Sequence, residues 1–288
     1  MPKNSPPAFG SQAYWNERFT SNDEPFEWLE SPTILDPYII SALSKASDEK
    51  PELLHIGCGT SLLSYHLRSH VDDPEQIHNL DYSVVAIELG RKREHDIYKN
   101  QDQYKRDPRE NGIAYMRWDA VDLLDYKSML HRCKRAAYFV ILDKSTSDSI
   151  ACGDDVHAPL PYPVAVRSYE PLNLEPTAST VPLHPVIVMA VNLALVARPG
   201  AHWIALSYSS ERFDFLDSAT SEWIPQCLPF PYPNQLWRVV ERREVDDTEW
   251  QVRNEKKEDK VAHRPKVCNF VYVLERTDVP LFVRGEHI

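Results

Sequence analysis

The sequence predicts a single α/β domain with a Rossmann-like, mostly parallel seven-stranded sheet, helices on both faces and an antiparallel pair of strands at one edge. Three observations lead to this fold class. Short apolar segments alternate with segments of helical periodicity, and a glycine turn or an acid ends the early apolar segments. Two late strands follow one another without a helical pattern between them, which indicates antiparallel pairing.

Four strands are expected in the first half of the chain, at residues 52–56, 76–80, 113–118 and 137–142. The last of these is a continuous apolar run, as in a strand buried on both faces. Apolar residues recur at helical spacing over about 34–43, 62–67 and 83–98. Strands that alternate with helices in this way predict parallel pairing through crossover helices.

The second half of the chain continues the sheet. A helix is expected over 184–197, stopped by Pro199 and Gly200, and a strand follows at 202–207. The antiparallel edge pair is expected at 237–245 and 267–275, joined by a charged hairpin loop of about 246–266.

Two segments do not fit the regular pattern. Residues 1–12 are polar and proline-bearing and predict a flexible tail, so the single domain is expected over residues 13–288. Residues 153–185 contain seven prolines and are interpreted as an insertion. An insertion of this length is either a disordered loop or a lid over a functional site.

Composition excludes several classes of protein. The 288 residues are 42% hydrophobic and 26% charged, as in globular domains, and carry a formal net charge of −11. That acidity argues against nucleic acid and anionic membrane surfaces as partners. The five scattered cysteines indicate a reducing compartment, and the longest apolar run is too short for a transmembrane segment. We therefore expect a cytoplasmic protein, with the nucleus as an alternative location.

The chemistry is concentrated at three successive strand ends. Gly57 and Gly59 follow the first strand, Asp81 ends the second, and Asp119 or Asp122 follows the third. In an open α/β sheet, ligands bind beyond the carboxyl ends of the strands. A glycine turn lets backbone approach a ligand. Asp81 can accept hydrogen bonds from both ribose hydroxyls, and Asp119 or Asp122 can accept one from an adenine amino group. The series predicts an adenosine pocket.

Two kinds of adenosine cofactor fit such a pocket. Dinucleotide-binding loops need a third glycine for tight helix–strand packing beside the pyrophosphate, and Leu62 occupies that position. A cofactor without phosphate, S-adenosyl-L-methionine, is therefore favoured, with S-adenosyl-L-homocysteine as the product. A nicotinamide-dependent oxidoreductase is the less favoured alternative.

Several motifs occur in one order over residues 13–152. They are YWNERF at 14–19, FEW at 26–28, LLHIGCGTS at 53–61, DYS at 81–83 and LDKSTSD at 142–148. This series resembles the methyltransferase-like family that includes the elongation factor 1-alpha lysine methyltransferases. The resemblance implies a class I methyltransferase, a transferase of the EC 2.1.1 group, that takes S-adenosylmethionine and methylates a protein, with lysine as the first acceptor.

The resemblance also implies which residues bind the cofactor. Three aromatic residues would close over it, the glycine turn would approach its methionine part, and the acid and tyrosine after the second strand would hold the ribose and flank the adenine. These residues, with the lysine after the fourth strand, are Trp15, Phe19, Trp28, Gly57, Gly59, Asp81, Tyr82 and Lys144. The adenine-edge acid aligns with Asp122-Leu123 without a gap and with Asp119-Ala120 with one.

Catalytic candidates follow the fourth strand. An amine acceptor must be neutral and aligned with the donor, and Asp143, Lys144 and Asp148 are the residues expected to shape that site. Ser145 and Ser147 stand where the family has glycine and leucine. These departures motivate a rival interpretation, an inactive or weakly active subunit that binds the cofactor and serves a heteromeric protein partner.

No metal is expected. His66 and His70 have the i, i+4 spacing of a helical pair of ligands, but no carboxylate or cysteine set lies beside them in the sequence. The sequence therefore predicts packed or solvated histidines at these two positions.

Overall fold

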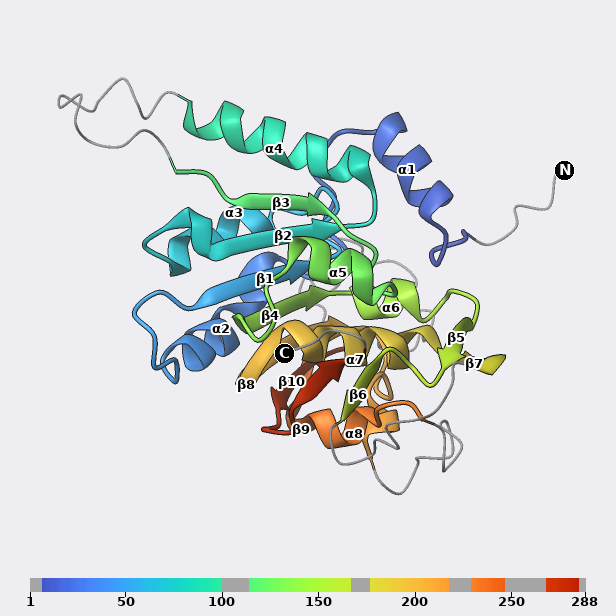
Figure 1. Cartoon of the computed structure of the whole chain (residues 1–288). Helices are drawn as coiled ribbons and strands as arrows, with labels where there is room; N and C mark the ends of the chain where they lie inside the picture. Colours follow the sequence, from blue (N-terminus) through green and yellow to red (C-terminus); the bar gives the residue numbers. More distant parts are fainter. Residues whose placement is uncertain (1–6, 100–113, 167–176, 218–228, 247–267, 285–288) are drawn as a thin grey trace, which may run out of the picture.

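The computed structural model describes residues 7–99, 114–166, 177–217, 229–246 and 268–284 (Figure 1). A seven-stranded sheet lies at its centre. In spatial order its strands are β3 (Arg117–Ala120), β2 (Ile77–Asp81), β1 (Glu52–Ile56), β4 (Tyr138–Lys144), β8 (Ala197–Ser207), β10 (Cys268–Arg276) and β9 (Trp237–Asp246). The first five are parallel, whereas β10 is antiparallel to both of its neighbours. The predicted class I methyltransferase (Rossmann-like) fold is confirmed, including its antiparallel edge pair.

Helices cover both faces of this sheet (Figure 1). The longer ones are α1 (Gln12–Ser21), α2 (Asp36–Leu43), α4 (Val84–Tyr98), α5 (Tyr126–Arg132) and α7 (Pro185–Val196). The short ones are η1 (Pro32–Leu35), α3 (Leu63–Leu67), η2 (Arg68–His70), η3 (Pro74–Gln76), α6 (Thr146–Ile150), η6 (Asp214–Leu216) and α8 (Pro233–Leu236). No helix of the described segments is both long and apolar enough to cross a lipid bilayer.

Two hydrophobic clusters form the core, one on each face of the sheet. Neighbouring residues of β1 enter different clusters, Leu53 with α2 and α3 and Leu54 with α5 and α7, because successive strand side chains point to opposite faces. Every residue of β4 is buried, as its continuous apolar run predicted. Every residue of α7 is buried as well. The carboxyl ends of the central strands are therefore held on a rigid, dry scaffold.

The third strand differs from its prediction. It runs from Arg117 to Ala120, so residues 114–116 of the predicted strand precede it, and residue 113 lies outside the described residues. The buried Glu94 of α4 accounts for the later start, because its Oε1 accepts a hydrogen bond from the Met116 backbone N–H at 2.8 Å, and its Oε2 accepts one from the Trp118 indole at 2.7 Å. These bonds hold the approach to β3 against the helix before the strand pairs with β2.

The proline-rich insertion forms regular structure in its described part. It contributes β5 (Val156–Leu160), β6 (Val164–Val166) and β7 (Thr177–Leu183). β5 pairs with β7, and β6 pairs with β11 (Leu281–Val283), both antiparallel. Of the two alternatives for this insertion, the disordered loop is therefore wrong for these strands. The predicted charged loop of about 246–266 lies outside the described residues apart from Asp246, the end of β9.

Part of the expected tail belongs to the folded domain. Residues 1–6 lie outside the described residues. Phe9, however, packs edge-on against Trp28 with ring centroids 5.1 Å apart, and its carbonyl accepts hydrogen bonds from Trp15 and Ser149. The tail prediction is wrong at this point because one aromatic residue in a polar segment shows no periodicity.

Candidate functional site

A cavity of about 460 Å³ opens at the carboxyl ends of the central parallel strands. Its floor comes from the turns after β1, β2, β3 and β4, and its wall comes from the N-terminal aromatic residues. Nine of the predicted cofactor residues and one catalytic candidate line it: Trp15, Phe19, Trp28, Gly57, Gly59, Asp81, Tyr82, Asp122, Leu123 and Asp148. Lys144, which was predicted for both roles, lines it too.

The glycine turn brings backbone to the cavity in a conformation that other residues adopt poorly. Gly57 has a φ of +54° and Gly59 a φ of +49°. A Cβ atom on Gly57 would lie 2.3 Å from the Thr146 Oγ1, and that hydroxyl donates a 2.8 Å hydrogen bond to the Ile56 carbonyl. The Thr146 side chain thus links the first and fourth strand ends and leaves no room for a side chain on Gly57.

Asp81 lies at the bottom of the cavity and is only 5% exposed. Its Oδ2 accepts a hydrogen bond from the Gly59 N–H at 2.9 Å, and its Oδ1 accepts one from the Ser83 N–H at 2.8 Å. Burial raises the pKa of Asp81 to about 6, against the lowering effect of these two bonds. A carboxylate fixed at both oxygens in this way is aimed to accept further hydroxyl donors.

The aromatic wall is a packed cluster from α1 and the loop after it. Trp15 stacks on Phe19 with ring centroids 5.6 Å apart and meets Trp28 edge-on at 6.2 Å. The Trp15 indole N–H donates to the Phe9 carbonyl at 2.7 Å. Phe9 and Phe26 also line the cavity and were missed as site residues. Phe26 lies within the quoted FEW motif, whereas Phe9 gave no signal.

An ion pair holds this wall over the strand ends. The Lys144 ammonium donates to Glu27 Oε2 at 2.7 Å and to the Trp28 carbonyl, and the lysine side chain is only 2% exposed. The same Glu27 carboxylate accepts hydrogen bonds from the Leu62 N–H and the Ser61 hydroxyl at the start of α3. Glu27 was not predicted as a site residue. Its role depends on a partner 117 positions away.

The sequence left two candidates, Asp119 and Asp122, for the acid expected to bind the adenine, and their contacts in the structure differ. Asp122 and Leu123 line the cavity, whereas Asp119 and Ala120 do not. Asp119 instead accepts a hydrogen bond from the buried His78 at 3.0 Å. The carboxylate Oδ1 of Asp122 accepts the Leu124 N–H at 2.9 Å, which orients it at the cavity edge.

The two aspartates proposed for catalysis differ in placement. Asp143 is fully buried outside the cavity lining, accepts hydrogen bonds from the Thr146 and Ser147 N–H groups, and has a pKa raised to about 6 by burial. It holds the turn into α6 and does not reach an acceptor. Asp148 lines the cavity, and its Oδ1 accepts a hydrogen bond from the Arg212 guanidinium at 2.8 Å.

One strained position marks the turn after β4. Ser145 has a φ of +67°, a left-handed conformation in which a Cβ is unfavourable. The family that the sequence resembles has glycine at this position. The turn after β4 thus adopts a backbone conformation that glycine would enter more easily than serine.

Comparison with known proteins supports the resemblance at the level of class I methyltransferases. No family model matches the chain. "Methyltransferase srdJ" of Neurospora crassa is 28% identical over 209 residues, which are 72% of this chain and 70% of that protein. This relative and the strand order support a class I S-adenosylmethionine-dependent methyltransferase.

Solved structures of similar shape include two methyltransferases crystallised with S-adenosyl-L-homocysteine. The N-methyltransferase NodS from Bradyrhizobium japonicum has a TM-score of 0.46 at 12% identity, covering 94% of this chain and 99% of its own. The geranyl diphosphate C-methyltransferase from Streptomyces coelicolor, whose crystal also contained Mg²⁺ and geranyl diphosphate, has a TM-score of 0.47 at 9% identity, covering 96% and 99%.

Proposed function

We propose that this chain transfers a methyl group from S-adenosyl-L-methionine to a lysine side chain of a protein. The observation that carries the cofactor part is the meeting of the Gly57 turn, Asp81 and the Trp15–Trp28 wall in one cavity. The lysine part rests on the resemblance of the YWNERF and LDKSTSD motifs to lysine methyltransferases. When bound, the cofactor supplies a sulfonium-activated methyl group.

The residues present fit that cofactor. Asp81 and Asp122 line the cavity, where Asp81 would accept hydrogen bonds from both ribose hydroxyls and Asp122 would accept one from the adenine amino group. The turn at Gly57 and Gly59, which lines the cavity, would bring backbone to the methionine part. Aromatic faces on Trp15, Phe19 and Trp28 favour a neighbouring cation, and a sulfonium carries that charge.

A second feature disfavours a dinucleotide. In nicotinamide-binding folds, the pyrophosphate lies at the start of the helix after the glycine turn. Here the Glu27 carboxylate already accepts the Leu62 N–H and Ser61 hydroxyl at that place. A pyrophosphate would lose these donors and meet a like charge.

Positioning is the main contribution of the remaining side chains. Lys144 and Glu27 hold Trp28 over the strand ends, which excludes water and orders the donor side of the cavity. Asp148 and Tyr208 line the cavity, and the Asp148 carboxylate accepts hydrogen bonds from the Tyr208 N–H and the Arg212 guanidinium. The acceptor amine would enter beside them. An acceptor amine loses its proton more readily in such a dry, aromatic setting, because desolvation lowers its pKa.

The test combines binding with labelling. Calorimetry with S-adenosyl-L-homocysteine should show binding that Asp81→Ala weakens by about 1–3 kcal/mol, since two hydrogen bonds to the ligand are lost. Asp119→Ala is the matched control, because Asp119 lies outside the cavity lining, and it should bind normally. Affinity for NAD with none for S-adenosyl-L-homocysteine would favour the oxidoreductase.

Labelling then tests the acceptor. Purified chain with radiolabelled methyl donor should label a protein in cell extract, and chemical blocking of lysines in that extract should abolish the label. Label that survives lysine blocking or enters the small-molecule fraction contradicts the lysine proposal. Cofactor binding without any labelling, restored by a co-purified protein, would support the subunit interpretation.

A further inference from the structure

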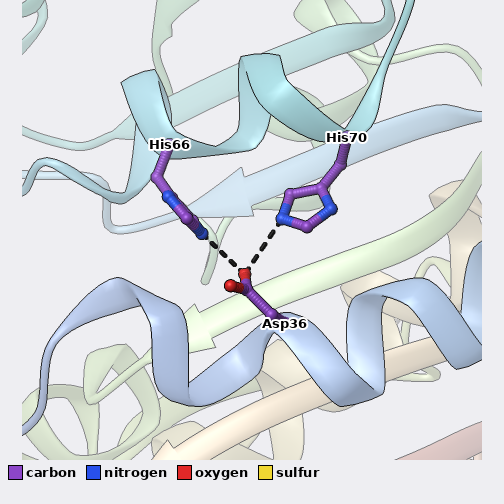
Figure 2. Close-up of side chains that lie close together, drawn as sticks. All are labelled: Asp36, His66 and His70. Atoms are coloured by element: carbon purple, nitrogen blue, oxygen red, sulfur yellow. Dashed lines mark hydrogen bonds and ion pairs between the residues drawn. The ribbon is translucent and has the colours of Figure 1, made fainter.

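Two histidines and an aspartate converge between α2 and the segment formed by α3 and η2. Asp36 Oδ1 lies 2.6 Å from His66 Nε2 and 2.9 Å from His70 Nε2, so both imidazoles meet the same oxygen (Figure 2). One ligand atom from each residue lies within 4.8 Å of the other two. None of the three lines the cofactor cavity.

The fold builds this cluster from two separate segments. Asp36 is the first residue of α2, whereas His66 and His70 belong to α3 and η2. Their i, i+4 spacing puts the two rings on one side of the helical segment, with centroids 5.3 Å apart. Leu35 and Leu63, both fully buried in the same core cluster, fix the two segments against each other.

The reason for expecting no metal at these histidines therefore no longer holds. It rested on the absence of a carboxylate near the histidine pair in sequence, and the structure supplies one from 30 residues upstream. Two imidazole nitrogens and one carboxylate oxygen form the three-ligand set of an open zinc site, in which water takes the fourth position. The side chains are 11–29% exposed, which leaves an entry path and room for that water.

We propose that Asp36, His66 and His70 bind one divalent transition-metal ion of the zinc class, which cross-links α2 to the segment after the glycine turn. The ion would replace the two hydrogen bonds with metal–ligand bonds of about 2.0–2.2 Å. In the metal-free cluster each Nε2 donates its proton to Asp36. On binding, the ion would displace these two protons, and each neutral imidazole would ligate through Nε2 with a proton on Nδ1. Imidazole with carboxylate favours zinc, cobalt or nickel over magnesium and calcium, which take oxygen ligands. This inference does not depend on the proposed methyltransferase activity.

The experiment titrates the full-length chain, dialysed against chelator, with Zn²⁺ alone and with Co²⁺ as a spectroscopic probe. One equivalent of Zn²⁺ should bind and raise the Tm, because a ligand that binds only the folded state stabilises it. Co²⁺ should give the visible absorption of a low-coordinate site with nitrogen ligands. His66→Ala and His70→Ala should each lower the affinity by about tenfold or more, since even the outer hydrogen-bond partner of a ligand is worth about 10–100-fold.

His131→Ala is the matched control, because His131 is an exposed helical histidine outside the cluster, and it should bind as the wild type does. Circular dichroism and urea unfolding without metal show whether each variant is folded. Asp36→Asn provides a milder variant that keeps the shape of the side chain. If the wild type leaves Co²⁺ with the spectrum of the hydrated ion, or if the histidine variants bind Zn²⁺ equally well, the cluster is a hydrogen-bonded clamp and the proposal is wrong.

Discussion

The Lys144 ammonium lies 2.7 Å from the Glu27 carboxylate and joins the end of β4 to the loop that carries Trp28. The lysine side chain is almost fully buried, so this pair is shielded from solvent on one side. Glu27 also closes the start of α3. Three parts of the cavity, its aromatic wall, glycine turn and fourth strand end, therefore depend on one ion pair.

Lys144→Met should weaken both the cofactor site and the fold. We expect unfolding free energy to fall by about 3 kcal/mol, since removing one partner leaves a partly buried charge uncompensated. Urea unfolding measures this change, and calorimetry should show weaker binding of S-adenosyl-L-homocysteine as Trp28 loosens. In the double variant Glu27→Gln/Lys144→Met, stability should recover in part. If Lys144→Met is as stable as the exposed control Lys127→Met, the Glu27–Lys144 pair does not contribute to the stability of the fold.

Gly57→Ala should destabilise the protein by about 2–4 kcal/mol, because positive φ and a close contact act together. The added Cβ would lie 2.3 Å from the Thr146 hydroxyl at a φ of +54°. Gly200→Ala is the matched control, since Gly200 has a φ of +77° with nothing within 4 Å of the added atom. The Tm of Gly57→Ala should be well below that of Gly200→Ala. Similar losses of stability in the two variants would mean that backbone strain causes the loss and the contact with Thr146 does not.

Ser145→Gly should stabilise the chain by about 0.5–1 kcal/mol, the gain from relieving a left-handed residue less the added chain entropy of glycine. Ser145 has a φ of +67° in the turn after β4. Its hydroxyl makes one long hydrogen bond, 3.4 Å to the Leu206 carbonyl, which costs little to lose. Urea unfolding of wild type, Ser145→Gly and Ser145→Ala separates the two effects, because alanine loses the bond and keeps the strain. A glycine variant no more stable than the alanine variant contradicts this account.

Residues near the strand ends were the predictable part of the site. Gly57 and Asp81 are marked in the sequence by a turn or an acid directly after an apolar segment, and parallel pairing then brings such ends together. The apolar segments also gave the bounds of β1 to the residue and those of β4 to within two residues.

Contacts between distant loops were not predictable in this way. Glu27 meets Lys144 and Asp36 meets His66 only after folding, and neither pair has a periodic signal. The short helix α6 was missed for a local reason, because TSDSI has no apolar stripe. The sequence also does not show which way a side chain points. Both Asp119 and Asp122 could be aligned with the acid expected to bind the adenine. In the structure Asp119 contacts His78 and does not line the cavity, whereas Asp122 does.

Cofactor affinity should depend on pH through Asp81. Burial raises the pKa of this carboxyl to about 6, from an ordinary value of 3.8. Ribose hydroxyls donate to the ionised form, so binding requires the proton to leave. As pH falls through about 6, affinity should therefore drop by as much as about tenfold per pH unit, the limit for one linked proton. Above pH 7 Asp81 is ionised in the free protein, and affinity should level off.

Calorimetric titration with S-adenosyl-L-homocysteine from pH 5 to pH 8 measures this dependence. Asp81→Asn removes the ionisable group while keeping its shape, so its weaker binding should vary far less with pH over this range. Asp143→Asn is the control, because Asp143 also has a pKa raised to about 6 by burial but lies outside the cavity lining. Its profile should keep the slope of the wild type. If the slope vanishes in Asp143→Asn and persists in Asp81→Asn, the linked proton belongs to the turn after β4, and Asp81 does not bind the ribose as an anion.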